Sequence, residues 1–154
     1  MTIPNSIYFP FSRLSPINHT DKVKGKLNKL GIKSGKPNCG IVSMAYITDK
    51  PVSDITELYR KRYYTGKGWQ GGTHNSNRFI LLRNLGVNCV HVKFKSKTLM
   101  TWFKNEADKT KVYEVTTTSH AMVYDKGVMI DQCGIVTDYA LISRTRLDKI
   151  IEII

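Results

Sequence analysis

The sequence is poor in cysteine and histidine, and neither residue type occurs in closely spaced pairs. Its 154 residues include Cys39, Cys89 and Cys133, together with His19, His74, His91 and His120. An odd cysteine count without a CxxC pair argues against a disulfide framework, and unpaired cysteines and histidines argue against a zinc site. We therefore expect no bound metal, and a reducing compartment such as the cytoplasm.

Long apolar runs are also missing. No stretch approaches the length of a membrane span, and the first residues have neither a basic region nor a continuous apolar segment. No Pro/Gly/Ser-rich run is long enough to link two domains, and no GxxxxGK[ST] phosphate-binding pattern is present. The expectation is a soluble, intracellular protein of one domain, without membrane contact.

Acidic residues are scarce: 12 Asp and Glu stand against 24 Lys and Arg, for a formal net charge of +12. Much of the excess lies in one short stretch that holds Lys22, Lys24, Lys26, Lys29, Lys33 and Lys36. Such a balance favours polyanions, from nucleic acid to an acidic protein surface. A solvated basic surface and a non-specific anionic partner explain the lysines equally well. No aromatic residues alternate with them as in sequence-specific nucleic-acid readers.

The order of the predicted elements is helices first and strands second. Residues 1–20, rich in proline and polar residues, are expected to form an extended N-terminal arm before a single domain over 21–154. Helices are expected over 22–30, over 41–47, from Ser53 as N-cap to Arg62, from Asn75 or Ser76 to Leu85, and over 98–106. Strands are expected over 87–94, 112–118, 120–124, 128–131 and 147–154. This order predicts an α+β fold with helices packed on an antiparallel sheet.

Cys39 is the residue best placed for chemistry. It follows a loop dense in turn formers and precedes an apolar segment expected to be a buried helix. Free N–H groups at a helix start stabilise a thiolate and can receive an oxyanion, and Gly40 leaves room for a substrate. Cys89, within a valine-rich strand, fits instead a small buried hydrophobic residue.

His120 and Asp131 flank a predicted hairpin whose register decides whether they meet. A nucleophilic thiolate needs a base within hydrogen-bond reach and a third polar group that orients the base. If Lys126 and Gly127 form a two-residue loop, Asp131 shares a face with His120 on a diagonal. If the loop has three residues, Gln132 lies opposite His120 instead. We favour Asp131.

These motifs resemble those of a known family. Asn38-Cys39-Gly40 before an apolar helix, and Ser119-His120-Ala121-Met122-Val123-Tyr124 before a glycine turn and Ile130-Asp131, resemble the small papain-like cysteine peptidases related to bacteriocin-processing enzymes. Many of these are encoded by phages. The resemblance covers roughly residues 35–135. It implies a papain-like fold, a Cys39–His120–Asp131 triad and hydrolysis of an amide or isopeptide bond in a protein or peptide, without a cofactor.

The sequence departs from that family at the oxyanion hole. Papain-like enzymes usually carry a glutamine several residues before the nucleophile, and residues 32–37 contain none. The resemblance then leaves Asn38 and the Cys39 backbone as candidate donors. Gly40, Trp69, His74 and Gln132 are candidate cleft residues, although an exposed surface position is the more usual one for a histidine such as His74.

Three hypotheses remain open from the sequence. The first is a papain-like cysteine hydrolase, whose relatives include deamidases, transglutaminases and acyltransferases that use the same triad. The second is a catalytically degenerate basic module that binds an anionic partner. The third is a phage virion component held by its N-terminal arm, which would place the protein in a virion rather than in the host cytoplasm.

Overall fold

A computed structural model describes residues 17–32, 38–66, 68–118, 120–137 and 145–154. Most of the expected N-terminal arm, together with Lys33 and Lys36, lies outside the described residues. The helices are α2 (Ile17–Leu30), α3 (Cys39–Thr48), α4 (Val52–Tyr63), α5 (Asn75–Asn84) and α6 (Leu99–Asn105). The strands are β1 (Cys89–His91), β2 (Val112–Thr117), β3 (Ala121–Asp125), β4 (Val128–Asp131), β5 (Gly134–Ile135) and β6 (Leu147–Ile153).

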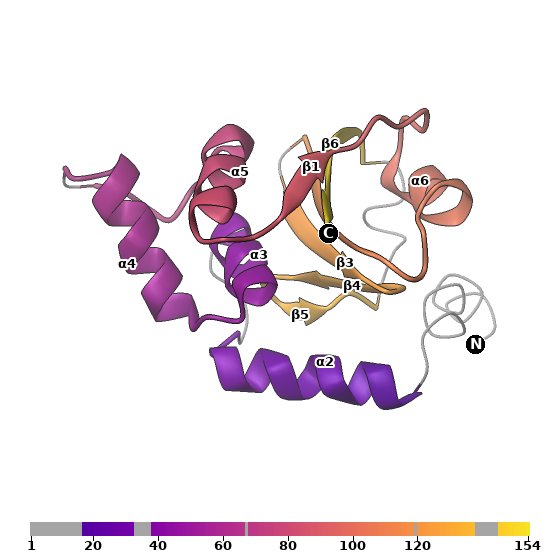
Figure 1. The fold of residues 1–154 in the computed structure, drawn as a ribbon, viewed down its shortest axis with the longest axis horizontal. Coiled ribbons are helices and arrows are strands. Elements are labelled where there is room, and N and C mark those ends of the chain that lie inside the picture. The colour runs from indigo at the N-terminus through magenta and orange to yellow at the C-terminus, as the bar shows by residue number, and fades with distance from the viewer. Residues whose placement is uncertain (1–16, 33–37, 67, 119, 138–144) are drawn as a thin grey trace.

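The strands form one antiparallel sheet in the order β1-β6-β2-β3-β4-β5. Helices α3 and α5 lie on one side of this sheet and α6 lies on the other (Figure 1). The α+β class and the packing of N-terminal helices on an antiparallel sheet are thereby confirmed.

Helix α3 lies at the centre of the helical layer. Every residue from Gly40 to Tyr46 is buried, including Ser43, which is the pattern of a helix enclosed on all sides. Ile41 and Met44 pack toward α4 and α5, while Val42 and Tyr46 join a second cluster with α2 and strands β3 and β4. The helix that begins with Cys39 is thus fixed against most of the molecule.

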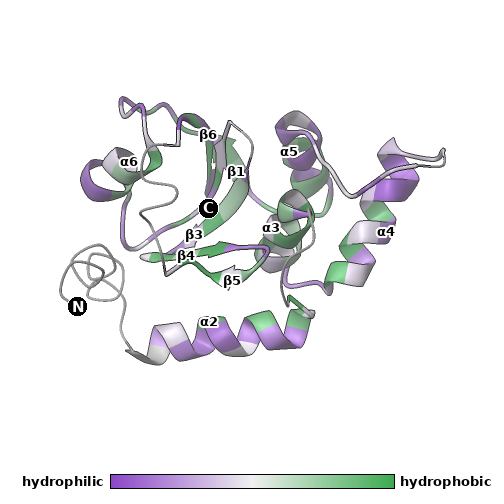
Figure 2. Ribbon diagram, turned by 180° about the vertical axis from the view of Figure 1, so that it is seen from behind, coloured by the Kyte–Doolittle hydropathy of each residue, from purple (hydrophilic) through white to green (hydrophobic). Residues whose placement is uncertain are grey.

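Helix α2 is amphipathic and packs against α3 and against strands β3 and β4. Val23, Leu27 and Leu30 follow one another at helical spacing and are buried. Figure 2 shows α2 as a largely hydrophilic helix with a few hydrophobic bands. The exposed lysines of this helix, Lys22, Lys24 and Lys29, therefore lie outside the core.

The hairpin between β3 and β4 has the two-residue loop, the first of the two alternatives considered from the sequence. Asp125 pairs with Val128, and the register continues through Val123 and Ile130. Lys126 and Gly127 both have positive φ, 50° and 97°, as a type I′ turn requires. This is the register that sets Asp131 on the diagonal from His120.

Several element boundaries differ from those expected. Helix α2 begins at Ile17 rather than at residue 22, so residues 17–20 are helical and not part of an arm. The N-cap of α4 is Pro51, which places Ser53 inside the helix rather than at its cap. β1 is shorter than the expected strand over 87–94, although the N–H of Val92 still donates to the Ile150 carbonyl of β6 at 2.9 Å. Beyond it, the N–H groups of Lys95 and Ser96 donate to the Glu106 carboxylate. The two-residue strand β5 was not predicted.

Candidate active site

Cys39 is the first residue of α3. The carbonyl of Asn38 accepts the first helical hydrogen bond from Val42, at 3.0 Å, and the carbonyl of Cys39 accepts another from the Ser43 hydroxyl, also at 3.0 Å. The N–H groups of a first helical turn have no partner within their own helix. The nucleophile candidate is therefore half-buried on a rigid element, at its positive end.

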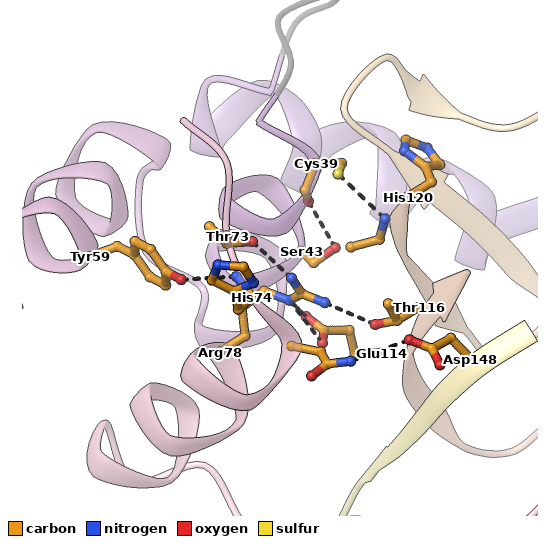
Figure 3. Close-up of polar contacts among 12 residues, drawn as sticks. Cys39, Ser43, Tyr59, Thr73, His74, Arg78, Glu114, Thr116, His120 and Asp148 are labelled. Atoms are coloured by element: carbon orange, nitrogen blue, oxygen red, sulfur yellow. Dashed lines mark hydrogen bonds and ion pairs between the residues drawn. The ribbon is translucent and has the colours of Figure 1, made fainter. Parts of the chain in front are cut away.

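The sulfur of Cys39 meets the start of β3. The backbone N–H of Ala121 donates to Cys39 Sγ at 3.4 Å (Figure 3). The preceding residue, His120, lines the same two cavities as Cys39, and its side chain is close enough to influence the pKa of the thiol. His120 directly precedes β3, where its carbonyl accepts the Thr117 N–H at 2.8 Å and so closes the β2–β3 hairpin. The start of a helix and the start of a strand thus bring the thiol and the imidazole to the same place.

Asp131 lies on the other side of the imidazole. Its Oδ2 is 3.3 Å from His120 Nε2, and its Oδ1 accepts the backbone N–H of Cys133 at 2.8 Å. The second bond fixes the carboxylate independently of the histidine. The order thiol, imidazole, carboxylate is the arrangement that a general-base-activated nucleophile requires.

The electrostatics of the three groups favour a charged pair. Burial raises the pKa of the Cys39 thiol, but the hydrogen bonds from His120 and Ala121, with the positive charges of His120 and Arg78, outweigh burial and lower it. The hydrogen bonds to Asp131 and to Cys39 raise the pKa of His120 to about 9, against the opposing effect of burial. Both shifts favour the thiolate–imidazolium form of the pair over the neutral form.

Two cavities of about 270 Å³ each share Cys39 and His120 in their walls. The first, here called the threonine cavity, is otherwise lined by Thr73, His74, Asn75, Arg78, Thr116, Thr117, Thr118, Ala121 and Asp148. The second, here called the glycine cavity, is otherwise lined by Gly40, Gly71, Gly72, Thr73 and Gln132. The thiol thus faces space on two sides, as an extended substrate would need.

A buried ion pair supports the site from below. Arg78 Nε lies 3.2 Å from both carboxylate oxygens of Glu114, and these side chains are 3% and 0% exposed. The same guanidinium donates to the hydroxyls of Thr73 and Thr116, each at 2.8 Å (Figure 3). Helix α5 is thereby connected to strand β2 directly beneath the cavities.

The close contacts of Thr73 and Arg78 with the start of α3 require a glycine at residue 40. A Cβ at this position would lie 1.8 Å from Thr73 Oγ1 and 2.9 Å from Arg78 Cδ. The start of α3 can approach Thr73 and Arg78 this closely only because residue 40 has no side chain.

The candidate cleft residues are placed unequally. Gly40, His74 and Gln132 line the cavities, and the side-chain oxygen of Gln132 is buried without a hydrogen-bond partner among the described residues. Trp69 lines neither cavity, contrary to expectation. The Trp69 ring stacks on Tyr64, and its Nε1 donates to the Gly72 carbonyl at 2.8 Å. Trp69 therefore contacts the backbone of a residue that lines the glycine cavity without lining the cavity itself.

The Asn38 side chain makes no capping hydrogen bond to α3. The amide group of Asn38, next to Cys39 in the chain, is therefore not used to cap the helix. No observation places this amide over the sulfur, so its part in an oxyanion hole stays a prediction, as does the binding of an anionic partner by the lysines of α2.

Sequence reasoning missed Arg78, Glu114, Thr116 and Asp148. A signal existed for Glu114 alone, because it is a charged residue between Tyr113 and Val115 in a strand that is otherwise buried. A buried carboxylate of this kind indicates a cationic partner, but the polar residues Asn75, Ser76 and Asn77 before Arg78 do not mark that residue as the partner. Thr116 and Asp148 carry no comparable signal.

Across the described part of the chain, no helix is long and apolar enough to cross a membrane. Nor do three or more His, Cys, Asp or Glu side chains gather there as metal ligands would. Comparison of the chain with protein-family models, with curated proteins and with solved structures gives no match.

Proposed function

We propose that this protein is a papain-like cysteine hydrolase that cleaves an amide, peptide or isopeptide bond through a thioester on Cys39. One observation carries the proposal. The His120 imidazole lies between the Cys39 thiol, whose pKa it lowers, and the Asp131 carboxylate, and the thiol belongs to the first residue of a helix. A structural cysteine needs none of these partners. A thiolate nucleophile needs all of them.

In the first half of the reaction the Cys39 thiolate attacks the carbonyl carbon, forming a C–S bond and an oxyanion. The free N–H groups at the start of α3, that of Cys39 among them, are the donors that receive this charge, with the Asn38 amide as a further candidate. The His120 imidazolium then gives its proton to the leaving amine as the C–N bond breaks. Asp131 holds the ring in orientation throughout.

In the second half His120, now neutral, accepts a proton from water as the water oxygen attacks the thioester carbonyl. The C–S bond breaks, the acid is released, and the sulfur leaves as a thiolate beside the imidazolium. An amine in place of water would give transfer rather than hydrolysis, and a glutamine side chain as substrate would give deamidation. The same residues serve in each case.

The reactivity of the thiol gives the first test. Iodoacetamide at neutral pH should alkylate Cys39 faster than Cys133, although Cys133 is the more exposed of the two, because only a thiolate attacks. Peptide mapping by mass spectrometry after timed exposure measures each site separately. Equal and slow labelling of Cys39, Cys89 and Cys133 would refute the proposal.

Formation of the acyl-enzyme gives the second test. p-Nitrophenyl acetate should release a burst of one nitrophenolate per chain, followed by slower turnover as the acetyl thioester hydrolyses. C39S should abolish the burst, and C133S, the matched control on an exposed cysteine, should leave it unchanged. A burst that survives in C39S would place the chemistry elsewhere.

A further inference from the structure

The strongest unexplained feature is a β-bulge that adds a carboxylate to the threonine cavity. In the pairing of β2 with β6, Thr116 lies opposite Lys149 whereas the next residue, Thr117, lies opposite Leu147. Asp148 is therefore the extra residue of the bulge. A bulge changes the direction of a side chain relative to a regular strand, and here Asp148 lines the same cavity as Cys39.

Asp148 differs from the other carboxylates near the site in its partners. Glu114 is neutralised by Arg78, and Asp131 is engaged by His120. Asp148 contacts a neutral group, the amide of Asn75, whose Nδ2 lies 3.5 Å from Oδ2 (Figure 3). Its chain neighbour Lys149 does not line the cavity.

The rest of the cavity wall is mostly polar. Thr117 and Thr118 continue the row begun by Thr116, and Thr73 faces them from the loop before α5. Arg78 also lines this cavity, but its guanidinium is paired with the Glu114 carboxylate, which leaves Asp148 as the carboxylate of the cavity wall. Hydroxyl oxygens around one carboxylate form the setting that an ammonium or guanidinium group prefers.

We propose that Asp148 determines specificity, by selecting substrates that carry a lysine or arginine side chain next to the bond attacked by Cys39. This inference rests on the proposed hydrolase function. A preference for cationic substrates is opposite to what the charge of the whole molecule favours, because a protein of net charge +12 attracts anions at long range. A preference for a cation at Cys39 must then come from a local carboxylate.

Charged thiol reagents measure the local field without requiring turnover. The methanethiosulfonates that carry an aminoethyl, a hydroxyethyl or a sulfonatoethyl group attach their chain to a thiolate by disulfide formation, with loss of methanesulfinate. In D148N the rate of the cationic reagent at Cys39 should fall about fivefold, as expected for two charges about 4 Å apart in water, to which Asp148 is exposed. The neutral reagent should be unaffected and the anionic one should accelerate. Cys133 in the same chain reports the long-range field and should not change.

Matched esters then measure specificity in the reaction. The p-nitrophenyl esters of N-acetyl-lysine and N-acetyl-norleucine differ chiefly in the terminal charge. The ratio of their kcat/KM values should favour lysine in the wild type, fall about fivefold in D148N and invert in D148K.

The outcomes separate the two proposals. If the esters do not turn over but D148N selectively slows the cationic reagent, the cavity binds cations and the hydrolase function fails. If the esters turn over and D148N changes neither the lysine preference nor the reagent ratio, the role of Asp148 is refuted. An equal effect of D148N on all three reagents would also refute it, since that would indicate a general disturbance of the site.

Discussion

Replacing Asp131 by asparagine separates the electrostatic role of the carboxylate from its place in the fold. Asparagine has nearly the same shape, so its side-chain oxygen can still accept the Cys133 N–H that Asp131 Oδ1 accepts at 2.8 Å. What the variant loses is the negative charge 3.3 Å from His120 Nε2. The hydrogen bond to that carboxylate is the largest single influence that raises the pKa of His120.

The expected change in His120 is large. With a pKa of about 9, the imidazole of the wild type is about 97% protonated at pH 7.5. An imidazole with the ordinary pKa of about 6.5 would be about 9% protonated at that pH. Because the hydrogen bond to Cys39 also raises the pKa, D131N should fall between these limits and toward the lower one. Loss of the imidazolium in turn raises the pKa of the Cys39 thiol, since the His120 contacts lower it.

Two measurements follow the two members of the pair. NMR titration of the histidine ring protons should show the His120 midpoint moving to lower pH in D131N, with H120A assigning the signal. The pH dependence of Cys39 alkylation by iodoacetamide should move its rise to higher pH. Because thiol and imidazole interact strongly, each midpoint belongs to the pair and both should be compared between variants.

D131E is the matched control, because it restores the charge on a longer side chain and should recover part of the shift. A His120 that remains protonated at pH 7.5 in D131N would refute the reasoning. The raised pKa would then have to come from Cys39 or from burial, and burial acts in the opposite direction.

Three further predictions concern the free energy of unfolding, measured in urea. G40A should lower it by about 1–3 kcal/mol, because the added Cβ would overlap Thr73 and Arg78. The control G25A, in open space on α2, should raise it by about 0.5–1 kcal/mol. Equal stabilities of G40A and G25A would contradict the packing described for residue 40. R78M should cost about 3–5 kcal/mol by leaving the carboxylate of Glu114 buried and uncompensated, and R78M/E114L should recover most of that loss; a double variant as unstable as the single one would show that the charge is not the cause. G127A should cost about 1 kcal/mol because φ is 97° at this turn residue, and an unchanged stability would argue against the type I′ loop.

The parts of the fold that the sequence predicted best are those in which a local pattern and its tertiary setting agree. The apolar run after Cys39 is helical and buried because no face of it is polar. The Lys126-Gly127 turn fixed the hairpin register because a two-residue loop with positive φ closes in one way, and that register joined residues 120 and 131.

The parts that sequence reasoning missed depend on long-range partners. Val92, Lys93 and Phe94 were included in a strand for their β-branched and aromatic content, but the pairing of β1 with β6 covers only Cys89 to His91. Asp148 is near the site only because one residue is inserted in the pairing of β6 with β2, and no local pattern marks such a bulge. Trp69 was named as a candidate cleft residue, whereas its ring stacks on Tyr59 and Tyr64 and lines neither of the two cavities described.

The proposed nucleophile and its partners come from opposite halves of the chain, with Cys39 on α3, His120 directly before β3 and Asp131 at the end of β4. During synthesis the cysteine leaves the ribosome well before residues 120–131 exist. Until then neither the imidazole nor the Ala121 N–H can lower the pKa of the thiol. The lowered pKa of Cys39 is therefore a property of the completed fold, and a nascent or unfolded chain carries an ordinary thiol.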